Sequence, residues 1–200
     1  MLGDWQKLLS FWFGELQDGI ADDEHRKMWF ASTPEHDTQC SSQFGPLLGP
    51  AAAGDLAHWL DTARGRLAFI ILCDQMPRNI YRGSADAFAW DQLALAASRE
   101  GIVMGVDKDL TWDERPFFYM PFEHSEDLID QHTCVGLFSG LLDEAPDAHK
   151  EAMEGTLRFA VHHREIIEQF GRFPHRNQAL KRQNSAAETA FLADHGGFGQ

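Results

Sequence analysis

The chain has 200 residues, 44% of them hydrophobic and 12% aromatic, a composition that supports a packed core and excludes intrinsic disorder. Its 31 acidic and 17 basic residues give a net charge of −14, so neither nucleic acid nor an anionic membrane surface is an expected partner. The length is that of one domain. With no apolar leader and no apolar run of membrane length visible, we expect residues 1–200 to form a single cytoplasmic domain.

Apolar residues recur at helical spacing along nearly the whole chain, and no segment alternates convincingly as a strand would. A first helix is expected to begin near Asp4, and a short second helix to occupy residues 22–30. In the third segment Thr33 is a helix cap and Gly54 ends the helix. Two Gly-Pro pairs interrupt the pattern between them, which predicts shortened helices over residues 31–54.

The middle of the chain carries two further helical patterns. Thr62 is expected to cap the first, whose buried face places Asp74 among leucine and isoleucine side chains, and Pro77 is expected to end it. Ser84 is expected to cap the second, which Gly101 would end in a left-handed conformation.

The C-terminal half continues in the same way. One helix is expected to start after Asp113, another at a Ser125 cap, and a long one after Pro146. The letters SAAE at 185–188 are a capping box for a last short helix, which the Gly-Gly pair at 196–197 is expected to end. We therefore predict an all-α fold of about eight or nine helices, packed as antiparallel pairs.

The sequence contains no recognisable cofactor motif. Its three cysteines are odd in number and widely spaced, which excludes a disulfide framework and a Cys-x-x-Cys site. Cys73 and Cys134 lie among apolar residues and are expected to be buried thiols. No zinc, di-iron, phosphate-loop or Gly-x-Ser-x-Gly motif occurs, so we expect neither a metal nor a cofactor.

One pattern occurs twice, at residues 74–84 and 170–185. Each copy follows an apolar helical stripe, contains a proline before an Arg-Asn pair and leads to a serine suited to starting a helix. Asparagine closes turns, and arginine binds carboxylate or phosphate in a planar fork. The copies are interpreted either as matching structural turns or as two walls of an anion pocket. Asp74, near a helix C-terminus, is expected to pair with a cation such as Arg78 or Arg82.

A second polar cluster lies between an aromatic run and the next helix. Capping explains Asp127, but it does not explain Glu123 and His124, which suit an acid–base pair or, as a minor alternative, metal ligands. His163 lies on an apolar stripe of the long helix, where a histidine is more often a hydrogen-bonded core residue than a ligand. Basic residues follow that helix directly, which makes a ligand role for His163 more plausible than usual.

The candidate ligand-binding residues are mainly the charged or amide side chains of these three regions. They are Asp74, Arg78, Asn79, Arg82, Glu123, His124, Asp127, His163, Arg172, His175, Arg176 and Asn177.

Three long motifs in this order resemble the bacterial family catalogued as domain of unknown function 924. They are RGRLAFIILCDQMPRNIYRG at 64–83, FFYMPFEHSED at 117–127 and FGRFPHRN at 170–177. The similarity also takes in FWFG at 11–14 and GGF at 196–198, so it covers nearly the whole chain. The resemblance implies an all-helical, tetratricopeptide-like superhelix, and it implies no activity.

Three functions fit these observations. The first is a binding module, a right-handed array of helix pairs that holds a small anionic molecule or a peptide carboxylate in a concave polar pocket. The second is a small-molecule enzyme, hydrolase-like, with Glu123, His124 and His163 as acid–base groups. The third is a purely structural polar core whose partners bind the outer surface. None of the three fixes an oligomeric state.

Overall fold

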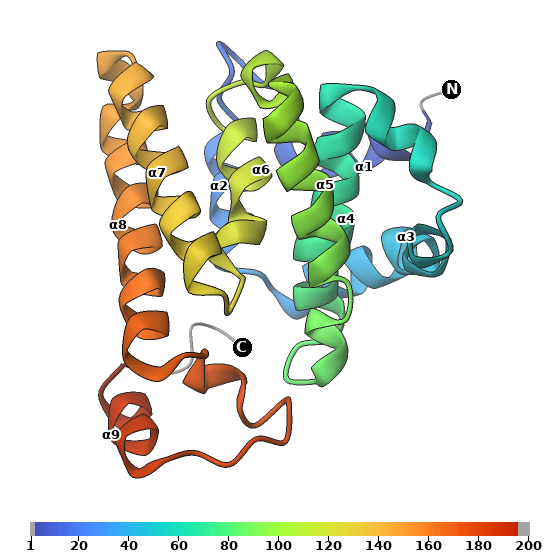
Figure 1. Cartoon of the computed structure of the whole chain (residues 1–200). Helices are drawn as coiled ribbons and strands as arrows, with labels where there is room; N and C mark the ends of the chain where they lie inside the picture. The colour runs from blue at the N-terminus through green and yellow to red at the C-terminus, as the bar shows by residue number, and fades with distance from the viewer. Residues whose placement is uncertain (1–2, 196–200) are drawn as a thin grey trace. The chain divides into compact units, whose positions relative to one another are not determined.

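The helical periodicity of the sequence becomes nine α-helices in residues 3–195, the part of the chain that the computed structural model describes. No β-strand lies within those residues, which confirms the all-α prediction. The helices, shown in Figure 1, are α1 (Asp4–Phe13), α2 (Asp23–Phe30), α3 (Pro34–Ala53), α4 (Ala63–Ile80), α5 (Asp91–Met104), α6 (Glu114–Glu123), α7 (Leu128–Glu144), α8 (Asp147–Phe170) and α9 (Ala186–His195). Four short 3-10 helices join them: η1 (Ala57–Asp61), η2 (Ala85–Phe88), η3 (Val106–Asp109) and η4 (Pro174–Arg176).

Three predicted helix starts are confirmed by their hydrogen bonds. The Thr33 side chain accepts the His36 N–H at the start of α3, and Thr62 accepts the Gly65 N–H at the start of α4. At α9, Ser185 and Glu188 form a reciprocal capping box. The Ser185 hydroxyl accepts the Glu188 N–H at 3.1 Å, and the Glu188 carboxylate accepts the Ser185 N–H at 2.6 Å. The Gly-Gly pair expected to end α9 lies outside the described residues.

The predicted interruption of residues 31–54 is wrong. Helix α3 runs for 20 residues, with Pro46 and Pro50 inside it, and ends at Gly54 as expected. Its buried side chains, among them Phe44 and Leu48, pack against α4, and this packing outweighs the local penalty of the prolines.

Three predicted boundaries are also wrong. Helix α5 starts at Asp91, because the Ser84 hydroxyl accepts the Asp86 N–H ahead of the separate turn η2. It passes through Gly101 and ends at Gly105, whose φ of 74° is left-handed. The cap of α7 is Asp127, because the Ser125 hydroxyl already accepts the Asp127 N–H.

The twofold pattern of the sequence does not become a twofold structure. In the first copy Pro77 lies inside α4, which continues to Ile80 and so does not end at the proline as predicted. In the second copy Gly171, with φ 67°, ends α8 before Pro174 starts the separate turn η4. No glycine precedes Pro77 in the corresponding place, so nothing stops the first helix early.

The described residues cluster into two compact units. The first contains the residues up to Ile80 and Phe88–Pro121, and the second contains Tyr81–Ala87 and the residues from Phe122 onward. The chain crosses between the units three times, so a single domain over residues 1–200 stays a prediction, as does a tetratricopeptide-like superhelix.

The first unit is built around α4, which packs against α1, α3 and α5. All residues of α4 from Gly65 to Asp74 are buried, which explains the apolar run in the sequence. An aromatic cluster lies beside it, where Phe117 contacts Trp12, Phe13 and Trp29 edge-on. No helix in the described part of the chain is both long and apolar enough to cross a membrane.

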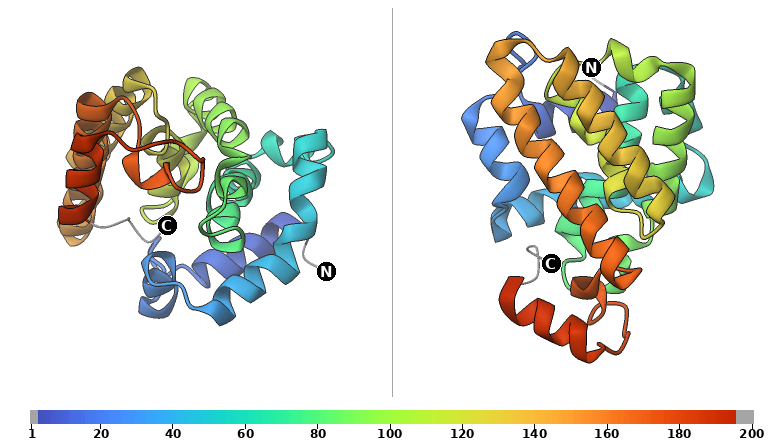
Figure 2. Two further views of the ribbon diagram at one scale, coloured as in Figure 1. Left: turned by 90° about the horizontal axis from the view of Figure 1, so that it is seen from below. Right: turned by 60° about the vertical axis from the view of Figure 1, so that its left-hand side comes forward.

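The second unit is built on the hairpin of α7 and α8, which lie side by side in Figures 1 and 2. Only two residues connect them, so the two helices run antiparallel. At the end of α8, Ile166, Ile167 and Phe173 form a small core that Phe191 of α9 joins. Cys134 of α7 is buried, as is Cys73 of the first unit, which confirms both expectations.

Candidate functional site

In the first unit the candidate residues Asp74 and Arg78 form an ion pair at the end of α4. The Arg78 Nη1 lies 3.2 Å from Asp74 Oδ1, and Asp74 is only 1% exposed. The same guanidinium also binds both carboxylate oxygens of Asp91, at 2.7 and 3.0 Å. The expected pairing of Asp74 with a cation is confirmed, and two carboxylates share the charge of Arg78.

Arg78 and its neighbour Asn79 also hydrogen-bond to backbone carbonyls in the last turns of α4. Arg78 Nη1 donates to the Asp74 carbonyl at 2.6 Å, and Asn79 Nδ2 donates to the Gln75 carbonyl at 2.9 Å. Helix α4 ends at Ile80, so these carbonyls lie within it, and the two side chains bond back onto the preceding turn. The Arg-Asn pair of the first copy is therefore tied to the helix that precedes it. Arg82 follows in the turn after α4 and is exposed.

In the second unit, the polar cluster after the aromatic run divides into capping residues and buried residues. Asp127 is exposed and accepts the Ile129 N–H at 2.7 Å, which is the structural role expected of it. Glu123, at the end of α6, is only 7% exposed. The buried Gln131 of α7 holds this connection by donating to the carbonyls of Glu123 and Ser125, each at 2.7 Å. His124, between them, is half-buried.

His163 of α8 is buried beside Glu123. Its Nδ1 lies 2.9 Å from the Phe159 carbonyl and 3.5 Å from the Glu123 carboxylate. A carbonyl only accepts hydrogen bonds, so Nδ1 carries the proton, and in the neutral ring Nε2 carries the lone pair. The pairing brings together two candidate residues that lie 40 positions apart in the sequence.

The surroundings of His163 keep its ring neutral. Burial lowers the pKa of His163 to about 3, and the nearby positive charges of His124 and Arg176 act in the same direction, against the raising effect of the hydrogen bond to Phe159. Cys134 of α7 is also buried, near the Glu123 carboxylate. Burial and the Glu123 charge raise the pKa of the Cys134 thiol well above its usual value, so it stays protonated and unreactive.

The ring of Phe173 joins the basic side chains of this region. His163 meets that ring edge-on with centroids 5.5 Å apart, and the Arg176 guanidinium lies over it, 4.6 Å from the centroid. The His175 ring lies 5.3 Å from the same centroid. Phe173 is fully buried and Arg176 is only 6% exposed. We call His124, His163, His175 and Arg176 the basic cluster.

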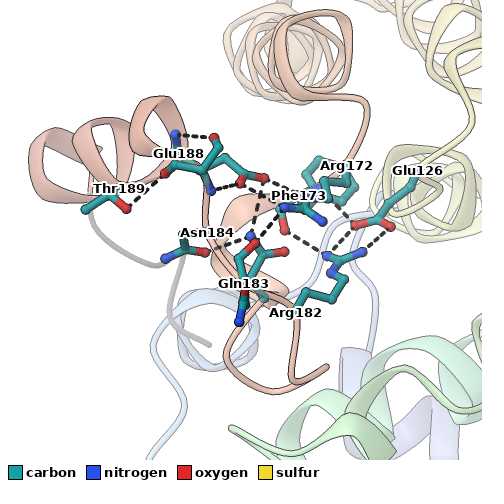
Figure 3. A network of polar contacts seen from close by, with 10 residues as sticks. Glu126, Arg172, Phe173, Arg182, Gln183, Asn184, Glu188 and Thr189 are labelled. Atoms are coloured by element: carbon teal, nitrogen blue, oxygen red, sulfur yellow. Dashed lines mark hydrogen bonds and ion pairs between the residues drawn. The ribbon is translucent and has the colours of Figure 1, made fainter.

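The remaining candidates of the second copy belong to a polar network that binds α9 (Figure 3). Arg172 forms a bidentate pair with Glu188, at 2.6 and 2.8 Å. Asn177 donates to Asn184 at 2.7 Å and also lies 3.3 Å from Glu188. The hydrogen bonds from Arg172 and from the Ser185 N–H lower the pKa of Glu188, even though burial opposes the shift. Arg172 and Asn177 therefore have internal partners, as Arg78 does.

Several residues that complete these sites carry little signal in the sequence. Asp91 and Glu126 were not candidates, because their partners lie 13 and 56 positions away in the sequence. Glu188 was recognised only as half of a capping box. Arg182 lies within the second copy of the pattern, and its position there is the one signal that would have found it. In the described residues no group of three or more His, Cys, Asp or Glu side chains is placed to hold a metal ion.

The fold and the partly buried basic cluster define the class of this molecule, an all-helical protein with ionisable side chains gathered in its second unit. The family model described as "Bacterial protein of unknown function (DUF924)" matches residues 8–196, so the chain belongs to this family. This confirms the resemblance seen in the sequence.

A solved structure shows the same fold. It is that of a protein of unknown function, ATU0120, from Agrobacterium tumefaciens. That protein is 33% identical in sequence, with a TM-score of 0.81, and the match covers 95% of this chain and 97% of the other. No curated protein matches this chain.

Proposed function

We propose that this protein binds a small anionic molecule, or the terminal carboxylate of a peptide, at the basic cluster of its second unit. The observation that carries the proposal is the approach of His163, His175 and Arg176 to the ring of Phe173, with His124 near enough for its charge to act on His163. These residues come from the α6–α7 connection, from η4 and from α8. A small anion would suit this gathering of basic groups in a protein of net charge −14, in addition to the carboxylates of Glu123 and Glu126 that lie near it.

The buried groups suggest a division of roles in binding. Arg176 offers the planar donor fork that suits carboxylate and phosphate, and its stacking on Phe173 fixes the plane of that fork. His163, neutral and with its proton on Nδ1, supplies a hydrogen-bond acceptor at Nε2. Glu123 supplies a negative charge beside it. The ligand that fits these groups is anionic at one end and carries a hydrogen-bond donor at the other.

A hydrolase-like enzyme is the second candidate, because the Glu123–His163 pair resembles an oriented acid–base pair. A pKa of about 3 favours binding over this role, because an efficient general base has a pKa near the working pH. The enzyme hypothesis predicts that any ester- or amide-hydrolysing activity of the parent is lost in His163→Ala. Full activity in that variant would exclude it.

For the first copy of the pattern we propose a structural role. Arg78 and Asn79 hydrogen-bond to carbonyls of α4, and Arg78 also pairs with the carboxylates of Asp74 and Asp91, so the pattern there is explained without a ligand. Partners that bind the outer surface, the third hypothesis, are compatible with such a role.

Calorimetric titration tests the proposed function. The probes are inorganic phosphate, citrate, and a tripeptide in its free-carboxylate and amidated forms. Arg176→Gln is expected to weaken binding of the anionic probe by about 10- to 100-fold, the value of a hydrogen bond to a charged group. The matched control is Arg158→Gln, an exposed arginine of α8. Unchanged affinity in Arg176→Gln, or a parent protein that binds none of the anions at millimolar concentration, would contradict the proposal.

A further inference from the structure

The segment that carries Phe173, His175 and Arg176 has little regular structure of its own. Between the end of α8 at Phe170 and the start of α9 at Ala186 it contains only the three-residue turn η4. A binding site on such a segment needs other contacts to hold it in place. Figure 3 shows where they come from, since Glu126, before α7, and Arg182, later in the same segment, face one another beside Phe173.

Glu126 and Arg182 form a bidentate ion pair. Arg182 Nη1 lies 2.8 Å from Glu126 Oε2, and Arg182 Nη2 lies 2.9 Å from Oε1. Both side chains are about one quarter exposed. Burial opposes ionisation of Glu126, but the hydrogen bonds from Arg182 and from the Phe173 N–H hold the pKa of Glu126 below its usual value.

The same ion pair holds both backbone groups of Phe173. The Phe173 N–H donates to Glu126 Oε1 at 2.8 Å, and the Phe173 carbonyl accepts from Arg182 Nη2 at 3.1 Å. Arg182 is itself tied back to the turn, because its N–H donates to the Asn177 carbonyl at 2.8 Å. Each partner makes a bond that the other is chemically unable to make, because a carboxylate accepts and a guanidinium donates.

We propose that Glu126 and Arg182 are positioning residues for the anion site. They hold the backbone of Phe173, whose ring carries the Arg176 guanidinium on its face and the His163 ring at its edge. The inference rests on the proposed function, because it assigns these two residues to the same site. We call this arrangement the Phe173 latch.

An ordinary ion pair on the surface would behave differently from the latch. Exposed pairs contribute little, and exchanging the two charges preserves their attraction. The same exchange should disrupt the latch. Glu126→Arg removes the acceptor for the Phe173 N–H, and Arg182→Glu removes the donor to the Phe173 carbonyl. The double variant Glu126→Arg with Arg182→Glu therefore separates the two explanations.

Two measurements on the full chain test the latch. Hydrogen exchange without ligand is followed for residues 171–184 by mass spectrometry, and inorganic phosphate and the free-carboxylate tripeptide are titrated by calorimetry. In Glu126→Ala and in the charge exchange we expect exchange in this segment to be at least 10-fold faster and affinity for the bound probe at least 10-fold lower. Glu126→Gln keeps an acceptor for the Phe173 N–H, so we expect it to retain most of the slow exchange and most of the affinity of the parent. The control Glu154→Ala removes an exposed pair on α8 and should change neither.

The outcomes are distinguishable. Slow exchange in Glu126→Ala, or normal behaviour of the charge-exchanged variant, would overturn the latch. Fast exchange with unchanged affinity would overturn the positioning role alone. Fast exchange together with a parent that binds neither anion would overturn the proposed function and, with it, the positioning role. If Glu126→Ala does not fold, the charge-exchanged and Glu126→Gln variants decide between the same results.

Discussion

At the scale of single residues, the buried charges of this protein lie beside partners that balance or orient them. Asp74 and Asp91 share Arg78, and Arg172 binds Glu188. An isolated charge in an apolar interior costs several kcal/mol, so removing one partner should be far more harmful than removing an exposed charge. In the basic cluster the neutral His163 lies beside the Glu123 carboxylate.

Arg78→Ala tests the structural role assigned to the first copy. The substitution leaves Asp74 buried without its guanidinium, so we expect a loss of about 3–5 kcal/mol in the free energy of unfolding. Urea denaturation measures it. Arg158→Ala, at an exposed position, should stay within about 0.5 kcal/mol of the parent. A near-neutral Arg78→Ala would show that α4 does not depend on this pair.

His163 should make stability depend on pH. Because its native pKa is lowered to about 3, the unfolded chain binds a proton below about pH 6.5 that the native chain excludes. Stability contributed by this group is therefore full above pH 6.5 and falls as the pH drops toward 3. Between pH 7 and pH 5, the free energy of unfolding of His163→Gln should fall by about 1–2 kcal/mol less than that of the parent. Urea denaturation at the two pH values measures the difference. His132→Gln, at an exposed position of α7, is the control. Equal losses in the parent and in His163→Gln would mean that His163 is not kept neutral.

At the scale of elements, local signals predicted helices better than they predicted helix ends. The caps at Thr33, Thr62 and Ser185 could be predicted from the sequence, because the N–H group that each side chain accepts lies three residues further on. The ends at Pro77 and Gly101 were misplaced, because α4 continues through its proline to Ile80, and Gly101 lies inside α5, close to Phe118 and Arg66.

The candidate site shows the same division. His124, His163 and Arg176 could be named from their positions, since each is a basic residue that capping or turn chemistry does not require. Their approach to one another, and the supporting pair of Glu126 and Arg182, could not be predicted, because it depends on how the α6–α7 connection, α8 and η4 meet in the second unit.

Gly101 provides a test of packing at the scale of an element. A β-carbon there would lie 2.5 Å from Phe118 Cζ and 2.7 Å from Arg66 Cδ, so Gly101→Ala should destabilise the protein by about 1–3 kcal/mol. Gly136→Ala, in α7, is the matched control. Nothing lies within 4 Å of its added carbon, so the better helix propensity of alanine should stabilise by about 0.5–1 kcal/mol. Thermal unfolding of both variants measures the contrast, and an equal response would contradict the packing explanation.

At the scale of the whole molecule, the prediction of a single domain has a convenient test. All six tryptophans belong to the first unit, so their fluorescence reports that unit alone, whereas far-UV circular dichroism reports the helices of both units. A single cooperative domain gives coincident urea midpoints for the two probes. Separate midpoints would show that the units unfold independently.

The central claim is that a small anion binds at the basic cluster, and nuclear magnetic resonance of the histidine rings tests it most directly. The chain has ten histidines, and ¹⁵N labelling of their rings gives each site its own signal. Inorganic phosphate and a tripeptide with a free carboxylate are titrated in turn. We predict that one of them shifts the signals of His124, His163 and His175, while those of the exposed His58 and His132 stay in place. Signals of the basic cluster that do not move with either anion, or that move no more than the exposed ones, would contradict the claim.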